Sequence, residues 1–255
     1  MREKIYTIPI HDAFAQDCEC PVCAMYRKLE ENAIHYTIGP GASYMEEDIR
    51  AQMDEQGFCQ KHLKDLYEYP NKVGLAMMLK THMDRTIKGL EKAAKSPLPG
   101  PNSMFKKNAK PASPVIDFIE EQERKCFVCG YIRQTFESYL RTIFYLYERE
   151  EEFRRQFAGS KGFCTGHYKN LFELAPKYLN KKYLEPFLRE LNERYLENFK
   201  RVRDDVEWFI CKNDYRYQEE PWKNARDSLQ RALTKVGSMI VSEDEHEGGK
   251  GSGEI

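Results

Sequence analysis

The amino-acid sequence predicts an all-α protein made of two tandem, duplicated helical units, each closed by a metal site of three cysteines and one histidine. Three observations lead to this prediction: apolar residues recur at spacings of three and four, strand patterns are scarce, and one Cys/His motif occurs twice. Charged residues make up 32% of the chain and balance to a formal net charge of −1. No overall field therefore favours nucleic acid or an anionic membrane.

The helices are predicted from the spacing of apolar residues, which form one stripe along each of three long segments. The alternation in residues 5–10 is short and fits extended coil as well as a strand. The helix after the first C-x-x-C is expected to stop at Gly39-Pro40-Gly41, and a new helix to start at Ser43, where Glu46 would close a capping box. The long stripes cover residues 75–90, 132–147 and 183–211, and a last amphipathic helix is expected over 223–236.

The Cys/His motif has nearly the same spacing in both copies. A C-x-x-C pair precedes a G-F-C-x-x-H sequence, with 36 residues from Cys23 to Cys59 and 35 residues from Cys129 to Cys164. Three thiols and one imidazole are the ligands of a closed zinc site, so two zinc ions per chain are expected; an iron–sulfur cluster on the same ligands is the alternative. We expect each ion to close a helical hairpin within one copy, although exchange of ligand pairs between the copies stays open. The predicted ligands are Cys20, Cys23, Cys59 and His62 in the first copy and Cys126, Cys129, Cys164 and His167 in the second.

The repetition extends beyond the metal ligands. Apolar and charged positions of residues 46–50 match those of 150–154, and residues 63–68 match 168–173, which indicates an internal duplication. A proline-rich stretch between the copies reads as a linker, and the acidic, glycine-rich end of the chain reads as disordered. The predicted organisation is a first unit over 1–95, a linker over 96–114, a second unit with C-terminal helices over 115–241, and a tail over 242–255.

The segment from 208 to 222 is rich in aromatic and polar residues. It could build a ligand pocket, or it could lock the terminal helix onto the bundle, and the absence of a nucleophile–base pair favours the structural interpretation. The candidate pocket residues are Trp208, Lys212, Asp214, Tyr215, Arg216 and Trp222.

A non-catalytic function is expected because both metal sites have a full ligand set. The chain is interpreted as a zinc-stabilised helical module that binds a protein or a small molecule. A metal-dependent enzyme would require a ligand such as His62 or His167 to leave the metal, and a redox protein would require iron–sulfur clusters. Basic residues in 189–203 alternate with acidic ones, which indicates a solvated face and not nucleic-acid binding. Without a secretory signal or an apolar run of about 18 residues, the protein is expected to be cytoplasmic and free of membrane contact.

With these motifs laid out, the chain resembles an uncharacterised bacterial family known only as a domain of unknown function. The resemblance rests on I-x-I-x-x-A-F at 8–14, E-C-P-x-C at 19–23, S-Y-M-E-E-D-I-R at 43–50, the two G-F-C-x-x-H sequences, and N-D-Y-R-Y-x-x-E-P-W at 213–222. It extends from about residue 4 to about residue 237, with no departure at the eight ligand positions. It implies one continuous family unit and no established activity.

Overall fold

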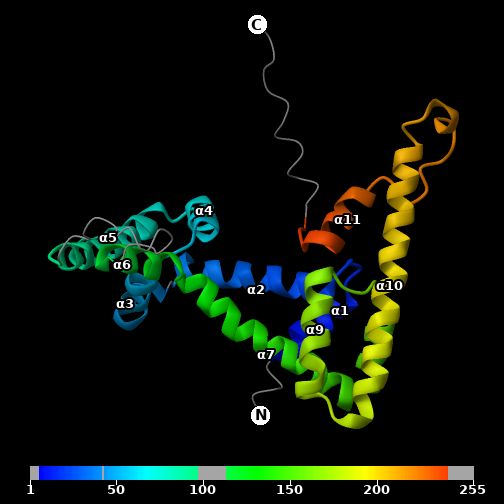
Figure 1. Ribbon diagram of the computed structural model, residues 1–255, viewed down its shortest axis with the longest axis horizontal. Helices are drawn as coiled ribbons and strands as arrows, with labels where there is room; N and C mark the ends of the chain where they lie inside the picture. Colours follow the sequence, from blue (N-terminus) through cyan, green and yellow to red (C-terminus); the bar gives the residue numbers. More distant parts are fainter. Residues whose placement is uncertain (1–5, 42, 97–112, 241–255) are drawn as a thin grey trace, which may run out of the picture. The chain divides into compact units, whose positions relative to one another are not determined.

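The computed structural model describes residues 6–41, 43–96 and 113–240, and within these ranges every regular element is helical (Figure 1). The all-α prediction is therefore confirmed for the described residues. The predicted tail over 242–255, and the predicted linker apart from residues 96, 113 and 114, lie outside them. The α-helices are α1 (Thr7–Ala15), α2 (Pro21–Ile38), α3 (Glu47–Gln56), α4 (Gln60–Glu68), α5 (Lys72–Ala94), α6 (Pro114–Glu123), α7 (Phe127–Arg149), α8 (Glu151–Gly159), α9 (Thr165–Tyr178), α10 (Lys181–Cys211) and α11 (Ser228–Gly237), with short 3-10 turns η2 (Ser43–Met45) and η3 (Tyr215–Tyr217).

The chain forms two compact units whose boundaries differ from the expected division at 96–114. Unit 1 combines Met1–Arg27 with Glu137–Ile255, and unit 2 is the continuous stretch Lys28–Phe136. The boundaries fall inside α2 and α7, so each of these helices contributes residues to both units. Unit 2 is thus inserted into the sequence of unit 1, an arrangement that the order of the motifs does not reveal.

In unit 1, α10 packs against α9 and α11, α11 also packs against α9, and α1 packs against α8. The core is aromatic and centres on the fully buried ring of Phe157. This ring lies 5.1 Å from Phe187, 5.2 Å from Phe163, 5.4 Å from Tyr147 and 6.0 Å from Phe14, between ring centroids. Such distances suit edge-to-face and offset aromatic contacts, which stabilise a core beyond the burial of apolar area alone.

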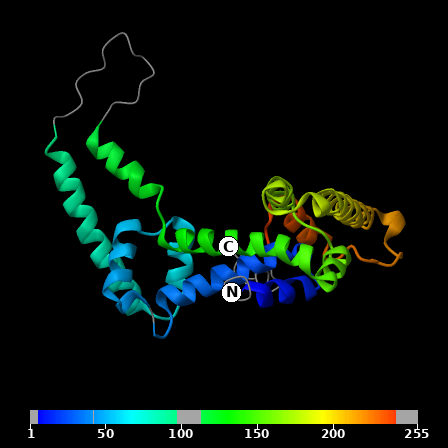
Figure 2. The same ribbon diagram turned by 90° about the horizontal axis from the view of Figure 1, so that it is seen from below.

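In unit 2, α5 packs against α3, α4 and α6, helices that Figure 2 draws in blue to green. The helix α3 also contacts η2. His82 on α5 contributes to this packing, because its Nδ1 lies 2.9 Å from the Asp54 carbonyl at the end of α3. Asn71 caps α5, since its side chain accepts a hydrogen bond from the Gly74 amide at 2.9 Å. The face of α5 that bears Leu75 and Met78 is buried, as the apolar stripe predicts.

Two local predictions at the N-terminal end differ from the structure. Residues 7–10, which carry a strand-like alternation, belong to the helix α1, whose residues Ile10, Ala13 and Phe14 are buried at helical spacing. Ser43 does not cap a helix: it begins the turn η2, and α3 starts only after Glu46, which occupies the N-cap position. The expected end of the preceding helix at 39–41 agrees with the end of α2 at Ile38.

Candidate metal centres

The eight predicted ligands come together in two clusters of three cysteines and one histidine. In each cluster the sulfur and nitrogen atoms that face inward all lie within 4.8 Å of one another. Centre A contains Cys20, Cys23, Cys164 and His167 in unit 1, and centre B contains Cys59, His62, Cys126 and Cys129 in unit 2.

The prediction that each motif copy closes its own hairpin is wrong, because the ligand pairs are exchanged between the copies. Centre A joins the first C-x-x-C to the second C-x-x-H, and centre B joins the first C-x-x-H to the second C-x-x-C. The nearly equal spacing within the two copies cannot distinguish these pairings. Which pairs meet is decided by the packing of helices that are distant in sequence.

Every ligand pair is placed at the start of a helix. The first cysteine of each pair immediately precedes α2, α4, α7 or α9, and the second ligand lies three residues later in the first turn. Free amide groups of that turn face the sulfurs: the Cys23 N–H donates to Cys20 Sγ, the Cys129 N–H to Cys126 Sγ and the His167 N–H to Cys164 Sγ, each at 3.4 Å. These amides and the positive end of the helix favour the thiolate over the thiol.

The glycine of each G-F-C-x-x-H sequence turns the chain into its cysteine. Gly57 has φ 57° and Gly162 has φ 75°, backbone angles that residues other than glycine rarely adopt. A Cβ atom at these positions would lie 2.7 Å from His82 Cε1 and 2.8 Å from the Arg194 carbonyl oxygen, respectively. The motif glycine is therefore required both for the turn and for the close approach of a neighbouring helix.

The distances between donor atoms fit one tetrahedral ion per centre. With zinc–sulfur bonds of about 2.3 Å and zinc–nitrogen bonds of about 2.0–2.1 Å, sulfurs should lie about 3.8 Å apart, and sulfur and nitrogen about 3.5 Å apart. In centre A, Cys23 Sγ lies 3.6 Å from Cys164 Sγ, and His167 Nδ1 lies 3.2–3.5 Å from the three sulfurs. In centre B, Cys59 Sγ lies 3.9 Å from Cys129 Sγ, and His62 Nδ1 lies 3.3–3.4 Å from the three sulfurs. The donor sets thus fit a metal of this size.

Centre A is surrounded by a buried ionic network that the sequence did not indicate. Lys235 on α11 is 1% exposed, and its ammonium donates to the carbonyls of Glu19 and Lys161 and lies 3.1 Å from Glu19 Oε2. Arg201 on α10 donates to both carboxylate oxygens of Glu19 at 2.7–2.8 Å. The Ser238 hydroxyl lies 3.0 Å from Cys164 Sγ, so it can donate to that sulfur when the cysteine is a thiolate.

Centre B has a carboxylate behind its histidine. Nε2–H of His62 donates to Glu30 Oε1 at 3.2 Å, while Nδ1 faces the sulfurs. Lys61 in turn donates to the same oxygen of Glu30 at 2.5 Å, and Asp65 completes a group of carboxylates around the imidazole. A carboxylate in this position fixes the orientation of a ligating histidine and increases its basicity. Nothing in the sequence spacing pointed to Glu30, because it belongs to α2 and meets His62 only in the fold.

In the metal-free state the pKa of one thiol in each centre is lowered, that of Cys126 in centre B and that of Cys164 in centre A. Burial disfavours the Cys126 thiolate, but hydrogen bonds from His62 and from the Cys129 amide outweigh it and lower the Cys126 pKa to about 6. Burial and the neighbouring Cys126 charge raise the Cys129 pKa to about 12. In centre A, burial raises the Cys20 pKa to about 12, whereas hydrogen bonds from Cys20 and Cys23 lower the pKa of Cys164. A divalent cation would replace the remaining thiol protons.

The polar groups of the candidate pocket in the C-terminal segment contact the segment itself. Lys212 is 7% exposed, and its ammonium donates to the carbonyls of Tyr217, Gln218 and Glu220 at 2.6–2.8 Å. The ammonium also lies 5.3 Å from the centre of the Trp222 ring. Lys212 thus holds the turn after α10 in place.

The remaining residues of this candidate pocket behave similarly. The indole N–H of Trp208 donates to the Pro221 carbonyl at 3.0 Å, and Arg216 pairs with Asp214 at 2.7 Å. Tyr215 is 80% exposed. These contacts join the segment to itself and to the end of α10; both the locking of the terminal helix onto the bundle and a ligand pocket here stay predictions.

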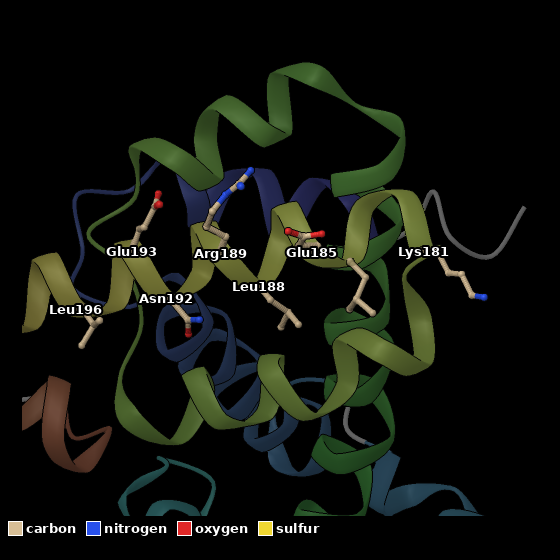
Figure 3. A pocket seen from close by; sticks show the side chains of 8 residues that line it. Lys181, Glu185, Leu188, Arg189, Asn192, Glu193 and Leu196 are labelled. Atoms are coloured by element: carbon tan, nitrogen blue, oxygen red, sulfur yellow. The ribbon is translucent and has the colours of Figure 1, made fainter.

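A hollow of about 600 Å³ lies along α10. The residues that line it all belong to this one helix, and Figure 3 shows Leu188 and Asn192 on one side of the helix axis and Arg189 and Glu193 on the other. The hollow is therefore an open helix surface, and its lining combines leucines with ionic side chains. It offers no grouped nucleophile and base.

Among the helices of the described residues, each is too short or too polar to traverse a lipid bilayer. Residues 1–243 match a family described as Family of unknown function (DUF6062). No curated protein matches the chain. No solved structure matches it either.

Proposed function

Because the chain belongs to this family of unknown function, which brings no established activity, we propose a function from the two centres themselves. The protein is a non-catalytic helical binding module in which two structural zinc ions, one in centre A and one in centre B, fasten distant chain segments. Its partner is a protein or a small-molecule ligand.

The observation that carries this proposal is the mutual distance of the four donor atoms, within 4.8 Å in each centre. Ligands of a [4Fe–4S] cluster bind different iron atoms and must lie further apart than ligands of a single ion. Three sulfurs and one imidazole nitrogen at tetrahedral spacing suit zinc, which prefers this ligand type and geometry. The same spacing supports zinc over the iron–sulfur alternative.

The number of donors supports a structural role for the metal. A zinc ion with four protein ligands has no open position for water or substrate, unlike the three-ligand sites of zinc enzymes. Structural zinc contributes about 10–16 kcal/mol in small domains, which is comparable to the whole net stability of a domain. We therefore expect removal of the ion to unfold the unit that holds it.

Elemental analysis and a visible spectrum of the full chain, purified without oxygen, test the proposal. The expected result is a colourless protein with two zinc ions per chain, one for each centre. A brown protein with iron, sulfide and absorption near roughly 400 nm would refute zinc and support a redox protein. Hydrolytic or other turnover that requires the zinc ion would refute the non-catalytic role.

A further inference from the structure

The two centres differ in how well their sulfurs are shielded from solvent. In centre A all three cysteines are buried, with Cys20, Cys23 and Cys164 at most 4% exposed. In centre B only Cys126 is buried, and Cys59 and Cys129 are partly exposed. A small reagent dissolved in water therefore reaches two sulfurs of centre B more readily than any sulfur of centre A.

The ionic side chains around the two centres have opposite net charge. Around centre A, Lys235 and Arg201 share one acid, Glu19, so the group carries one positive charge. Around centre B, Glu30 and Asp65 face His62 with one base, Lys61, so the group carries one negative charge.

A zinc ion with three thiolates adds one negative charge in either centre. Centre A with its surroundings is then neutral, whereas centre B has two negative charges. Negative charge nearby makes a thiolate easier to oxidise, because oxidation removes electrons from the sulfur.

Hydrogen bonds to the sulfurs add to this difference. In centre A the amides of Cys23, His167 and Cys164 and the hydroxyl of Ser238 reach the sulfurs. In centre B the amides of Cys129 and Cys59 reach Cys126 Sγ, and no hydroxyl group among the described contacts takes the place that Ser238 has in centre A. Each such bond withdraws electron density from a thiolate, so the sulfurs of centre A are less nucleophilic.

From burial, charge and hydrogen bonding together, we propose that centre B is an oxidation-sensitive site, in which peroxide joins Cys59 to Cys129 and releases the zinc ion. The inference rests on the proposed zinc content. The two sulfurs are already 3.9 Å apart and belong to the two partly exposed cysteines of the centre. Centre A loses its ion more slowly under the same conditions.

The chemistry balances with hydrogen peroxide as the oxidant. The first thiolate attacks one peroxide oxygen, which forms an S–O bond, breaks the O–O bond and releases hydroxide. The second thiolate attacks the resulting sulfenic sulfur, which forms the S–S bond and releases a second hydroxide. Two protons from solvent convert the two hydroxides to water, and the zinc ion leaves because only Cys126 and His62 remain as ligands.

The test treats the zinc-loaded full chain with hydrogen peroxide. Released zinc is followed with a chromogenic chelator, and disulfides are mapped by mass spectrometry. We expect one zinc ion to leave about tenfold faster than the other, together with a Cys59–Cys129 disulfide. Equal release rates, or a first release accompanied by oxidation of centre A cysteines, would overturn the inference.

Two variants outside the ligand set make the test specific. Asp65→Asn removes one negative charge beside centre B and should slow the release of zinc from centre B about threefold. Ser238→Ala removes the hydroxyl group that lies beside Cys164 Sγ and should speed the release of zinc from centre A. Unchanged rates in both variants would refute the electrostatic reasoning. Zinc content is measured before oxidation: a chain without zinc overturns the proposed function, while two ions lost at equal rates overturn only this inference.

Discussion

The exchange of ligand pairs can be tested by removing cysteines two at a time. Cys23→Ser and Cys164→Ser both damage centre A, so the double variant should lose no more metal than either single variant. Cys59→Ser damages centre B, so the double variant Cys23→Ser/Cys59→Ser should lose both ions. If the pairs were joined within each motif copy, these two results would be reversed.

The size of the stability change follows from the loops that the ions close. Cys23 and Cys164 are 141 residues apart, and closing a loop of that length is worth about 5 kcal/mol, against about 4 kcal/mol for the 36 residues between Cys23 and Cys59. Losing centre A should therefore cost at least about 5 kcal/mol. Because Cys23 and Cys164 act through the same ion, the two changes together should cost little more than either alone.

The assay is the zinc content of the purified variants, combined with hydrogen exchange. Cys23→Ser/Cys164→Ser should retain about one ion per chain and should keep amide protection in the helices α3, α4, α5 and α6 of unit 2. Cys23→Ser/Cys59→Ser should retain about none. The exchanged pairing would be refuted if Cys23→Ser/Cys164→Ser contained no metal while Cys23→Ser/Cys59→Ser retained one ion per chain.

Three further outcomes are expected. Glu30→Gln should lower the zinc affinity of centre B by roughly 10–100-fold and leave that of centre A unchanged, as measured by competition with a chelator. Equal losses of affinity in both centres would contradict the role of the Glu30 carboxylate in orienting His62. The pKa values of Cys20 and Cys23 are raised, so both thiols are protonated at neutral pH without metal, and zinc binding there releases two protons. Its apparent affinity should fall about 100-fold for each pH unit of acidification, and a pH-independent affinity would argue against these protonation states. Lys235→Met leaves the buried Glu19 carboxylate with one partner fewer. It should lower the free energy of unfolding, measured by denaturant titration, by about 3 kcal/mol. An unchanged denaturation midpoint would mean that the ionic network does not stabilise the fold.

Much of the fold was predictable because it depends on local patterns. The apolar stripe over 183–211 predicts α10 to within two residues, since one buried face of a long helix imposes its period on the sequence. The stop at 39–41 was predictable because glycine and proline end helices by local chemistry. The strand-like 5–10 segment was ambiguous, since a few alternating residues fit several conformations.

The candidate ligands were predictable as residue types but not as partners. Spacing along the chain places Cys164 and His167 in one helical turn, because that is a local property. It cannot decide whether they meet Cys129 or Cys23, since both loops can close. For the same reason Glu30 and Lys235 were missed: each reaches its centre from a helix that tertiary packing alone brings there.

The exchanged pairing has a consequence for the order in which the chain is made. Residues 20, 23, 59 and 62 leave the ribosome first, and they already supply three sulfurs and an imidazole before either final partner pair exists. At about 5–20 residues per second, Cys164 follows Cys23 by roughly 7–28 s, counting the 141 residues between them. A cation captured early by these four side chains would join the wrong helices. The correct fold then forms only after ligand exchange, in which Cys164 and His167 replace Cys59 and His62 on that ion. The concentration of free metal during translation should therefore influence the fraction of molecules that fold correctly.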